Sequence, residues 1–421
     1  MTWPAFPLAK LAIELQPGFA QQPNREEGGL PHLRTNNVSE EGHIDLSAIK
    51  TILPNREQRE KYSLQPFDIL FNNTNSPALV GKTALFTEKG EFLFSNHMTR
   101  IRVRPNLANP SYIARYLHWV WKTGGFRHMV TQWVSQAAIN RTQLTKLHVS
   151  LPPLAEQRRI VEILDQADAF RKKRAEADAK ADRILPALFY KMFGVPTKNN
   201  SCWEETSLGE FSLEFRYGTS TKCGVEPVGL PVLRIPNVIG GEVDLSDLKY
   251  AALSDDEAGR LLLEPGDILF VRTNGNPSYV GRCAIFDLVE RYVFASYLIR
   301  ARIDLRRADP RFVTEYLRTS KGRRAMAPYI RTTAGQSNIS VEGLRQIPIL
   351  LPPLSLQRQF GGFADIMRAS RRKREQARNL TRSFFDSTLH HAFTGDLTAR
   401  WRESRIKELL AEMEAQERAP V

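Results

Sequence analysis

The segment that decides the fold reads Leu151-Pro152-Pro153-Leu154-Ala155-Glu156-Gln157-Arg158-Arg159-Ile160. It returns 200 residues later as Leu351-Pro352-Pro353-Leu354-Ser355-Leu356-Gln357-Arg358-Gln359-Phe360. Self-similarity at a fixed separation is typical of internal repeats. A proline pair keeps the chain extended and then admits a helix, because proline is tolerated in a first helical turn. The two segments therefore predict the starts of two long helices.

Apolar residues after each proline pair step by three and four positions, which is the spacing of a coiled-coil stripe. Each run of roughly 40 residues predicts a rod of about 60 Å, and we expect Pro186 to bend or end the last turns of the first one. A rod cannot cover its own stripe, so the two are expected to pack together. The predicted stripe comprises Ile160, Ile163, Ala167, Phe170, Ala177, Ala181, Ile184 and Leu188, and then Phe360, Phe363, Met367, Ala377 and Phe384.

The stretches that precede the two helices also match each other, which makes the chain a tandem duplication of a globular block followed by a long helix. The matching pieces are Trp3 and Trp203, Arg34 and Arg234, Asn37 and Asn237, Asp45-Leu46 and Asp244-Leu245, 68–71 and 267–270, 80–82 and 280–282, and Tyr116-Leu117 and Tyr316-Leu317.

Within the first block the pattern predicts short strands followed by a helix. Residues 68–71 read as a buried strand, whereas 85–86 and 92–94 are expected to pair with neighbours as antiparallel strands. Residues 98–103 alternate as a half-exposed strand would, and a helix is expected from Pro110. The tail holds an amphipathic helix through Ile406, Leu409, Leu410 and Met413, which would cap the coiled coil or reach a partner.

Composition favours a polyanionic partner, because the 421 residues carry a formal net charge of +13 and a pI of about 9.7. The alternative is a basic protein without such a partner. The three cysteines form no CxxC pair, which excludes a disulfide framework and is consistent with a reducing compartment. No apolar run reaches the ~18 residues of a membrane span, and the N-terminus lacks signal-peptide features. We therefore expect a soluble cytoplasmic protein.

Three fragments suggest catalysis, and each has a better structural interpretation. Residues 81–83 end like a phosphate-binding loop, but Ser76 stands where that loop requires glycine. Residues 109–112 and 276–279 resemble the Asn-Pro-Pro-Tyr loop of adenine methyltransferases, yet no glycine-rich loop for the methyl donor precedes either, so turns are favoured. His390 and His391 are adjacent and point to different helix faces, which disfavours a shared metal. We expect neither a catalytic nor a metal site.

At these residues the chain resembles the DNA-specificity subunit of type I restriction–modification systems. The motifs that carry the resemblance are the Leu-Pro-Pro-Leu-x-x-Gln openings, 265–270, 280–282, 335–339, Met192-Phe193-Gly194 and 392–397. The resemblance implies an α+β fold with two pseudo-symmetric mixed α/β target-recognition domains, separated by two long helices that form an antiparallel coiled coil. The implied domains are 1–150 and 201–350, the spacer helices 151–195 and 351–395, and a charged helical tail 396–421.

The resemblance also implies the function. The chain would bind a bipartite, asymmetric DNA target without an active site or cofactor of its own. It would dock two adenine methyltransferase subunits and, for cleavage, up to two restriction–translocase subunits, so that S-adenosylmethionine, ATP and Mg²⁺ are expected on those partners. Two alternatives stay open: the specificity subunit of a methylation-only system, and a helical scaffold with two non-DNA interaction modules.

Duplication separates two kinds of DNA-contacting residue. Positions that differ between the blocks are expected to choose bases, whereas shared positions are expected to form turns or contact phosphates. For each residue the alternative is an ordinary exposed loop position. The differing set is Gln21, Gln22, Asn24, Arg25, Asn72, Asn73, Lys122, Arg127 and Gln132 in the first block, and Thr219, Ser220, Lys222, Arg272, Asn276, Arg323 and Arg331 in the second; the shared set is Arg34 and Arg234, Asn37 and Asn237, Thr74 and Thr273, and Asn75 and Asn274.

Two runs of four cations recur at matching helix positions. Arg174 and Arg374 fall on the predicted stripe, where a polar pair would fix the register. The remaining cations would neutralise phosphates, dock acidic partner surfaces, or simply face solvent. The runs are Arg171-Lys172-Lys173-Arg174 and Arg371-Arg372-Lys373-Arg374.

Overall fold

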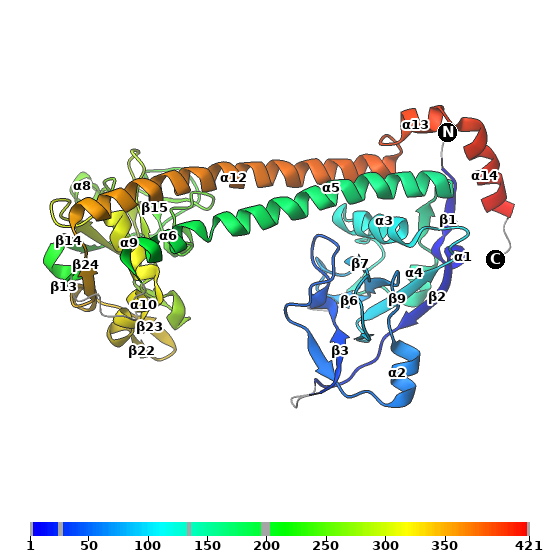
Figure 1. Cartoon of the computed structure of the whole chain (residues 1–421), viewed down its shortest axis with the longest axis horizontal. Helices are drawn as coiled ribbons and strands as arrows, with labels where there is room; N and C mark the ends of the chain where they lie inside the picture. Colours follow the sequence, from blue (N-terminus) through cyan, green and yellow to red (C-terminus); the bar gives the residue numbers. More distant parts are fainter. Residues whose placement is uncertain (1–2, 24–27, 133–135, 195–202, 419–421) are drawn as a thin grey trace. The chain divides into compact units, whose positions relative to one another are not determined.

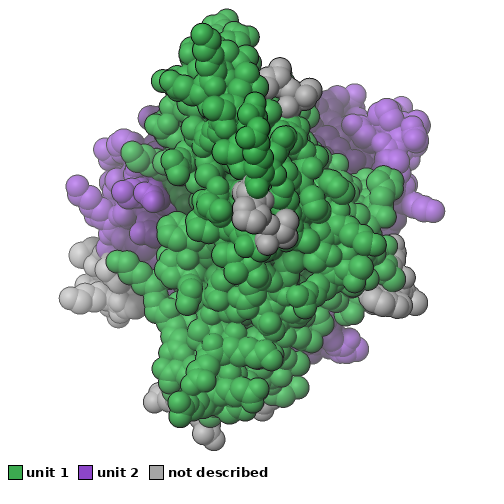
Figure 2. Space-filling model, turned by 90° about the vertical axis from the view of Figure 1, so that its right-hand side faces the viewer, with its two compact units in different colours: residues 1–174, 378–421 green, residues 175–377 purple. Residues whose placement is uncertain are grey.

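The computed structural model describes residues 3–23, 28–132, 136–194 and 203–418 (Figure 1). It divides into two compact units, which Figure 2 shows in separate colours. Unit 1 comprises residues 1–174 and 378–421, and unit 2 comprises residues 175–377. Each unit therefore contains one globular block together with a part of both long helices.

Unit 1 is built around a four-stranded antiparallel sheet in the order β2-β9-β5-β7. Smaller sheets, β4-β3-β8, β10-β11-β6 and β1-β12, lie in the same unit. The strands are β1 Ala5–Pro7, β2 Ala12–Pro17, β3 Leu30–Leu33, β4 Lys50–Ile52, β5 Ile69–Asn72, β6 Thr74–Asn75, β7 Thr83–Leu85, β8 Leu93–Phe94, β9 Met98–Val103, β10 Thr131–Gln132, β11 Ala137–Ala138 and β12 His148–Ser150; the helices of the block are α1 Leu8–Leu11, α2 Arg56–Tyr62, α3 Pro110–Lys122 and α4 Arg141–Thr145.

Unit 2 repeats these sheets as β14-β21-β17-β19, β16-β15-β20, β18-β23-β22 and β13-β24. The predicted duplication is thereby confirmed at the level of strand order. The strands are β13 Glu204–Ser207, β14 Ser212–Tyr217, β15 Leu230–Leu233, β16 Lys249–Ala251, β17 Ile268–Val271, β18 Thr273–Asn274, β19 Cys283–Ile285, β20 Val293–Phe294, β21 Leu298–Ile303, β22 Arg331–Thr333, β23 Gln336–Asn338 and β24 Pro348–Leu351; the helices are α7 Ile235–Val238, α8 Asp255–Leu261, α9 Pro310–Arg318, α10 Ser320–Met326 and α11 Val341–Arg345.

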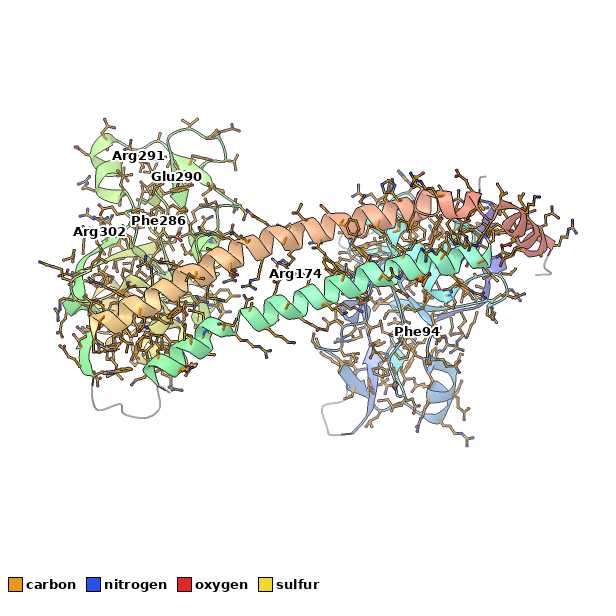
Figure 3. All side chains as sticks on the ribbon, turned by 45° about the horizontal axis from the view of Figure 1, so that its top comes forward. Phe94, Arg174, Phe286, Glu290, Arg291 and Arg302 are labelled. Carbon is orange, nitrogen blue, oxygen red and sulfur yellow. The ribbon has the colours of Figure 1, made fainter. Side chains whose placement is uncertain are left out.

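The central strand of each main sheet is buried on both faces. In β5, Ile69 and Phe71 pack into one core cluster and Leu70 into another that contains Phe94, because successive strand residues point to opposite faces. Figure 3 labels Phe94 and, from the corresponding cluster of unit 2, Phe286. The predicted strand at residues 68–71 is confirmed.

Two strand predictions were wrong in detail. β8 pairs in parallel with β3, not antiparallel. β9 is buried along nearly its whole length, including Arg100, rather than half exposed. The arginine tolerates burial because its guanidinium pairs with Glu14 at 2.6 Å and donates to the Ser63 carbonyl. Alternation of arginine with apolar residues therefore marked a buried ion network, not a solvent-facing side.

The long helices are α5 Leu154–Ala181, α6 Ile184–Phe193 and α12 Leu354–Thr394. They run in opposite directions, since α5 and α6 lead from unit 1 into unit 2 and α12 leads back, and the predicted antiparallel pair is confirmed. The break between α5 and α6 comes at residues 182–183, so Pro186 lies in the first turn of α6. That placement follows from the missing N–H of proline.

The predicted apolar stripe is wrong by one position at several places. Phe170, Ile184, Phe363 and Phe384 are exposed, whereas Leu164, Ala364 and Phe385 are buried. The helices pack into the cores of the globular blocks as well as against each other, and this second contact turns the buried face. The middle of the helices is polar: Arg374 donates to the Asp178 carbonyl at 3.0 Å and to Asp182 at 2.8 Å.

The repeated glutamine explains the spacing of the Leu-Pro-Pro-Leu-x-x-Gln openings. Gln157 is fully buried; its Oε1 accepts from the Asn109 amide at 2.7 Å and its Nε2 donates to the Leu107 and Pro152 carbonyls. Gln357 accepts from the Asp309 amide at 2.9 Å and donates to the Pro352 carbonyl in the same way. Each glutamine thus joins the start of a long helix to the N-terminus of α3 or α9.

The tail forms α13 Ala399–Glu403 and α14 Ile406–Arg418 and docks onto unit 1. Leu409 is buried, and the Glu412 carboxylate accepts from the Ala155 amide at 3.2 Å, in the first turn of α5. An acidic side chain there also complements the helix dipole. The expectation that the tail caps the coiled coil is confirmed. No helix in the described residues is long and apolar enough to cross a membrane.

Candidate nucleic-acid interface

In unit 2 the predicted residues gather at one end of the main sheet. β14 and β17 end there at Tyr217 and Val271, and β21 begins there at Leu298, because these strands are antiparallel. Arg272, Thr273 and Asn274 follow β17 directly, and Ser220 lies shortly after β14. Strand ends in one row place loop side chains on one surface.

The three-stranded sheet β18-β23-β22 extends this surface as a hairpin. Thr333 pairs with Gln336, so the loop has two residues, Ala334 and Gly335, with φ of 47° and 78°. Two positive φ values are the requirement of a type I′ hairpin turn. Residues 331–336 are all exposed, which presents Arg331 and Gln336 to solvent.

Unit 1 has the same sheet end with different side chains. Asn73, Thr74 and Asn75 follow β5 as Arg272, Thr273 and Asn274 follow β17. Beside them lies a hollow of about 520 Å³. Its lining includes Gln21, Gln22, Arg34, Lys50, Asn96 and His97.

A glycine fixes the loop after β2 and after β14, the corresponding strands of the two main sheets. A Cβ at Gly18 would lie 2.3 Å from the Phe94 carbonyl oxygen, and one at Gly218 would lie 2.1 Å from the Phe294 carbonyl oxygen. Only glycine permits that approach, which lets Phe19 bridge to Ser95 and Thr219 to Ala295. The bridges lead the chain toward the Gln21 and Ser220 loops.

Several residues predicted to contact DNA are buried or already bonded to other residues of the protein. Asn72 and Thr219 are buried; Asn72 donates to the Thr35 carbonyl at 3.1 Å, and Thr219 donates to Glu257 at 2.6 Å. Lys122 forms an ion pair with Asp386 on α12. Arg323 donates to the Val280 and Ser278 carbonyls, and burial lowers its pKa. The sequence does not reveal which polar residues already bond to partners within the protein.

The remaining predicted positions differ in how firmly they are held. Arg127, Lys222 and Asn276 are exposed, and the Asn276 side chain accepts from the Ser278 amide, as the turn interpretation expected. Asn37 and Asn237 are buried turn-formers that accept from the Arg34 and Arg234 amides. Asn24 and Arg25 lie outside the described residues, as does the side chain of Gln132.

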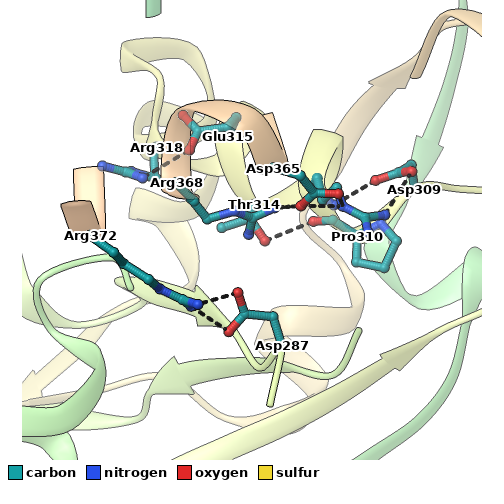
Figure 4. Close-up of polar contacts among 10 residues, drawn as sticks. Asp287, Asp309, Pro310, Thr314, Glu315, Arg318, Asp365, Arg368 and Arg372 are labelled. Atoms are coloured by element: carbon teal, nitrogen blue, oxygen red, sulfur yellow. Dashed lines mark hydrogen bonds and ion pairs between the residues drawn. The ribbon is translucent and has the colours of Figure 1, made fainter. Parts of the chain in front are cut away.

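The cation runs are largely engaged within their own units. Arg171 pairs with Asp168 at 2.6 Å, Arg371 with Glu242 at 3.0 Å, and Arg372 contacts both carboxylate oxygens of Asp287. Figure 4 shows the last contact together with Asp365 and Arg368, which form an ion pair at 2.7 Å. Arg311 pairs with the same Asp365 carboxylate at 2.8 Å. Arg371 and Arg372 join α12 to the globular block of unit 2, which the sequence did not predict, whereas Asp168 lies on the same helix as Arg171. Lys172, Lys173 and Lys373 are exposed, and Figure 3 labels Arg174 on α5.

The sequence analysis did not identify two exposed aromatic residues on the surface of unit 2. Tyr217 and Tyr297 are 41% and 58% exposed and flank Arg272. Their equivalents, Pro17 and His97, share neither size nor ring chemistry with them. Comparison of the aligned repeats at aromatic as well as polar positions would have found them.

No three metal-ligating side chains are grouped to hold an ion within the described ranges. The repeated carboxylates have structural partners instead. Asp68 accepts from the Gln65 amide at 2.8 Å and from Arg102, and Asp267 accepts from the Glu264 amide and Arg302, so both carboxylates cap the turn before their strand. The hydrogen bonds that Arg102 and Arg302 donate to these carboxylates raise the pKa of both arginines.

Comparisons with known proteins agree with this architecture. A family model described as the type I restriction modification DNA specificity domain matches residues 13–178. The specificity subunit of the type I restriction enzyme EcoKI from Escherichia coli K12 is 28% identical over 399 residues, which cover 89% of this chain and 83% of the relative. Over most of its length the chain is therefore similar to type I DNA-specificity subunits, and these similarities support a specificity subunit of a type I restriction-modification complex.

Three further similarities agree with this result: one with a curated relative, and two with solved structures that show the same fold. The StySPI specificity subunit from Salmonella potsdam is 26% identical over 401 residues, covering 89% of this chain and 83% of that one. The crystal structure of a type I S subunit from M. genitalium has a TM-score of 0.55 at 13% identity, covering 93% of this chain and 96% of the other, and supports the fold. A structure from a study of assembly of the type I system matches at TM-score 0.55 and 18% identity, covering 94% and 98%.

Proposed function

We propose that this specificity subunit reads a bipartite, asymmetric DNA target, with block 1–150 on one half-site and block 201–350 on the other. The observation that supports the proposal most directly is the pair of sheet ends, which share a backbone and differ in side chains. Identical folds with different side chains suit two half-sites of different sequence. The net charge of +13 would favour the phosphate backbone.

Shared and differing positions are proposed to have different roles in DNA binding. Thr74 and Asn75 recur as Thr273 and Asn274, and are proposed to hold phosphates or the loop itself. Arg34 and Arg234 belong to the same shared group. The differing residues that remain on the two surfaces are proposed to contact bases: Gln21 and Gln22 in the first block, and Ser220, Lys222, Arg272 and Arg331 in the second. Asn73 differs too, but its side-chain donors are bonded to the Asn96 carbonyl and the Thr99 hydroxyl.

We further propose that the segments 151–195 and 351–395 act as the spacer and dock the methyltransferase subunits. Each unit exposes apolar side chains on its part of the long helices, where solvent alone gives no reason for them. The residues are Phe170, Leu380 and Phe384 in unit 1, and Ile184, Phe363 and Ile366 in unit 2. Two patches accord with two methyltransferase copies, which would bring S-adenosylmethionine; restriction subunits would bring ATP and Mg²⁺.

Methylome sequencing of a host that carries this chain and its methyltransferase tests the proposal. A split motif with two unlike halves is expected. Replacing residues 1–150 by the first block of another family member should change one half only, and altered methylation at both halves would contradict the assignment. Equal affinity for target and scrambled duplexes at physiological salt, without methyltransferase recruitment, would favour a scaffold.

A further inference from the structure

The backbone around Arg272 is fixed on both sides, which makes its side chain a candidate for a defined base contact. The Arg272 amide donates to the Tyr297 carbonyl at 2.9 Å, and its carbonyl accepts from the Ile339 amide at 2.9 Å. The residue directly follows β17, whose four side chains are all buried. The backbone that carries the Arg272 side chain is therefore fixed at the end of the sheet.

The side chain itself is held in place without using up its donors. The Arg272 guanidinium lies 4.8 Å from the centre of the Tyr217 ring, and one Nη donates to the Ser296 carbonyl at 3.2 Å. The Tyr217 hydroxyl in turn accepts from the Val341 amide at 3.2 Å, which fixes the ring. Within the described chain that carbonyl is the one acceptor bonded to the guanidinium, so most of its five N–H donors have no partner among the described residues.

The first block provides a control built into the same chain. Asn73 occupies the position that corresponds to Arg272. Its side-chain amide nitrogen donates to the Asn96 carbonyl at 3.2 Å and to the Thr99 hydroxyl at 3.0 Å. Its Oδ1 accepts from the Thr74 hydroxyl. The donors of the Asn73 side chain are thus bonded within the protein, whereas most donors of the Arg272 side chain have no described partner.

The surroundings of the two positions differ in a correlated way. Thr99, which accepts from Asn73, is replaced by Ile299, which has no acceptor. Pro17 is replaced by Tyr217, which supplies the ring that stacks on Arg272. The second block therefore lacks the acceptor that Asn73 uses and adds an aromatic ring beside the guanidinium, so Arg272 is held in place while its donors stay available.

We propose that Arg272 reads a guanine in the half-site bound by the second block, with Tyr217 as its positioning residue. This inference rests on the proposed function. An arginine fork matches the O6 and N7 acceptors of guanine in the major groove, whereas adenine presents one acceptor and one donor at those positions. Stacking on an aromatic face preserves the planar fork geometry and lowers the conformational entropy lost on binding.

The test begins from the methylome of the wild-type complex, which defines both half-sites. Arg272→Ala and Arg272→Lys are each expected to relax specificity at one G·C pair of the second half-site and to leave the first half-site unchanged. With purified complex, a duplex carrying 7-deazaguanine at that pair should bind the wild type about 5- to 150-fold more weakly and Arg272→Ala no more weakly than the natural duplex. Tyr217→Ala should relax the same pair to a smaller extent.

Lysine separates base reading from a phosphate contact, because it keeps the charge and loses the fork. Restored affinity without relaxed specificity in Arg272→Lys, or uniform weakening on all sequences, would overturn the proposal. So would relaxation in the first half-site, or a second half-site without G·C. Arg345, which stacks on Phe215 at 5.0 Å, is the matched control, and Arg345→Ala should change neither half. A wild-type complex without any bipartite motif would instead remove the proposed function itself.

Discussion

Glu156 and Arg402 form a buried ion pair between the start of α5 and the C-terminal tail. The Arg402 Nε lies 2.8 Å from Oε1 of Glu156, whose side chain is 0% exposed. The Thr398 hydroxyl and the Trp3 indole donate to the same carboxylate, at 2.6 Å and 3.1 Å. The second repeat has Leu356 at this position, so the acidic residue belongs with the tail that only unit 1 receives.

Removing the arginine should destabilise the protein strongly. Arg402→Ala leaves a carboxylate buried without its counter-ion, and we expect a loss of ~3–5 kcal/mol in the free energy of unfolding, measured by denaturant titration. Adding Glu156→Leu, the residue of the second repeat, should recover much of that loss. Arg418→Ala, which breaks an exposed pair with Glu414, serves as the control and should change stability little. Equal losses in both single variants would refute the argument.

His118 should make stability depend on pH below neutrality. Its side chain is 5% exposed and neither ring nitrogen has a described hydrogen-bond partner; burial, helped by nearby cations, lowers its pKa from 6.5 to about 3. Below pH 6.5 the unfolded chain therefore binds a proton that the folded chain excludes. Stability should fall by ~1.4 kcal/mol per pH unit between pH 6 and 4. In His118→Gln this component should be absent, and an unchanged slope would disprove it.

Phe67 occupies a turn position that the second repeat gives to glycine. Its φ is 76° and its side chain is 59% exposed, while Gly266 has φ of 101°. A non-glycine residue in this region costs ~1–3 kcal/mol, and glycine adds ~0.5–1 kcal/mol of unfolded-state entropy. Phe67→Gly should therefore raise the thermal midpoint and Gly266→Ala should lower it. A Cβ at Gly266 would meet only Pro310 at 3.7 Å, so a clash does not confuse the comparison.

The duplication made much of the fold predictable from the sequence, because each motif occurs twice and both copies adopt the same backbone structure. The strands at Ile69 and Ile268, the helix starts after Pro153 and Pro353, and the capping tail were all predictable from local patterns. The buried face of the long helices was not, because it depends on contacts with α3 and α9. The heptad pattern around Phe170 and Phe384 describes packing of one helix against another, and it does not include packing against a globular block.

The interface was predictable as a set of loops and less so residue by residue. Arg272 and Asn73 both carry donors, and only the tertiary partners Thr99 and Ser296 show which donors are already used. Thr219 and Asn72 are of the same residue types as their exposed neighbours, yet they are buried. Polar type indicates what a side chain can bond, but its partners decide whether that capacity remains for DNA.

The exposed apolar patch of unit 1 yields the last prediction, on the proposed methyltransferase contact. Leu380 and Phe384 are 73% and 64% exposed and lie four residues apart, so they share one face of α12. Charge at that face would have to be desolvated on docking. Leu380→Glu combined with Phe384→Glu should therefore lower the number of methyltransferase copies bound from two to one, as read by native mass spectrometry.

The patch of unit 2, with Phe363 and Ile366, would retain the remaining copy. Arg382→Glu is the matched control, because it reverses an exposed charge between the two substituted positions that points to another side of the helix. It should leave both copies bound. The thermal midpoint should stay unchanged in both variants, since none of the three side chains is buried, which separates lost docking from lost folding. Two bound copies on the double variant would show that this face is not the contact.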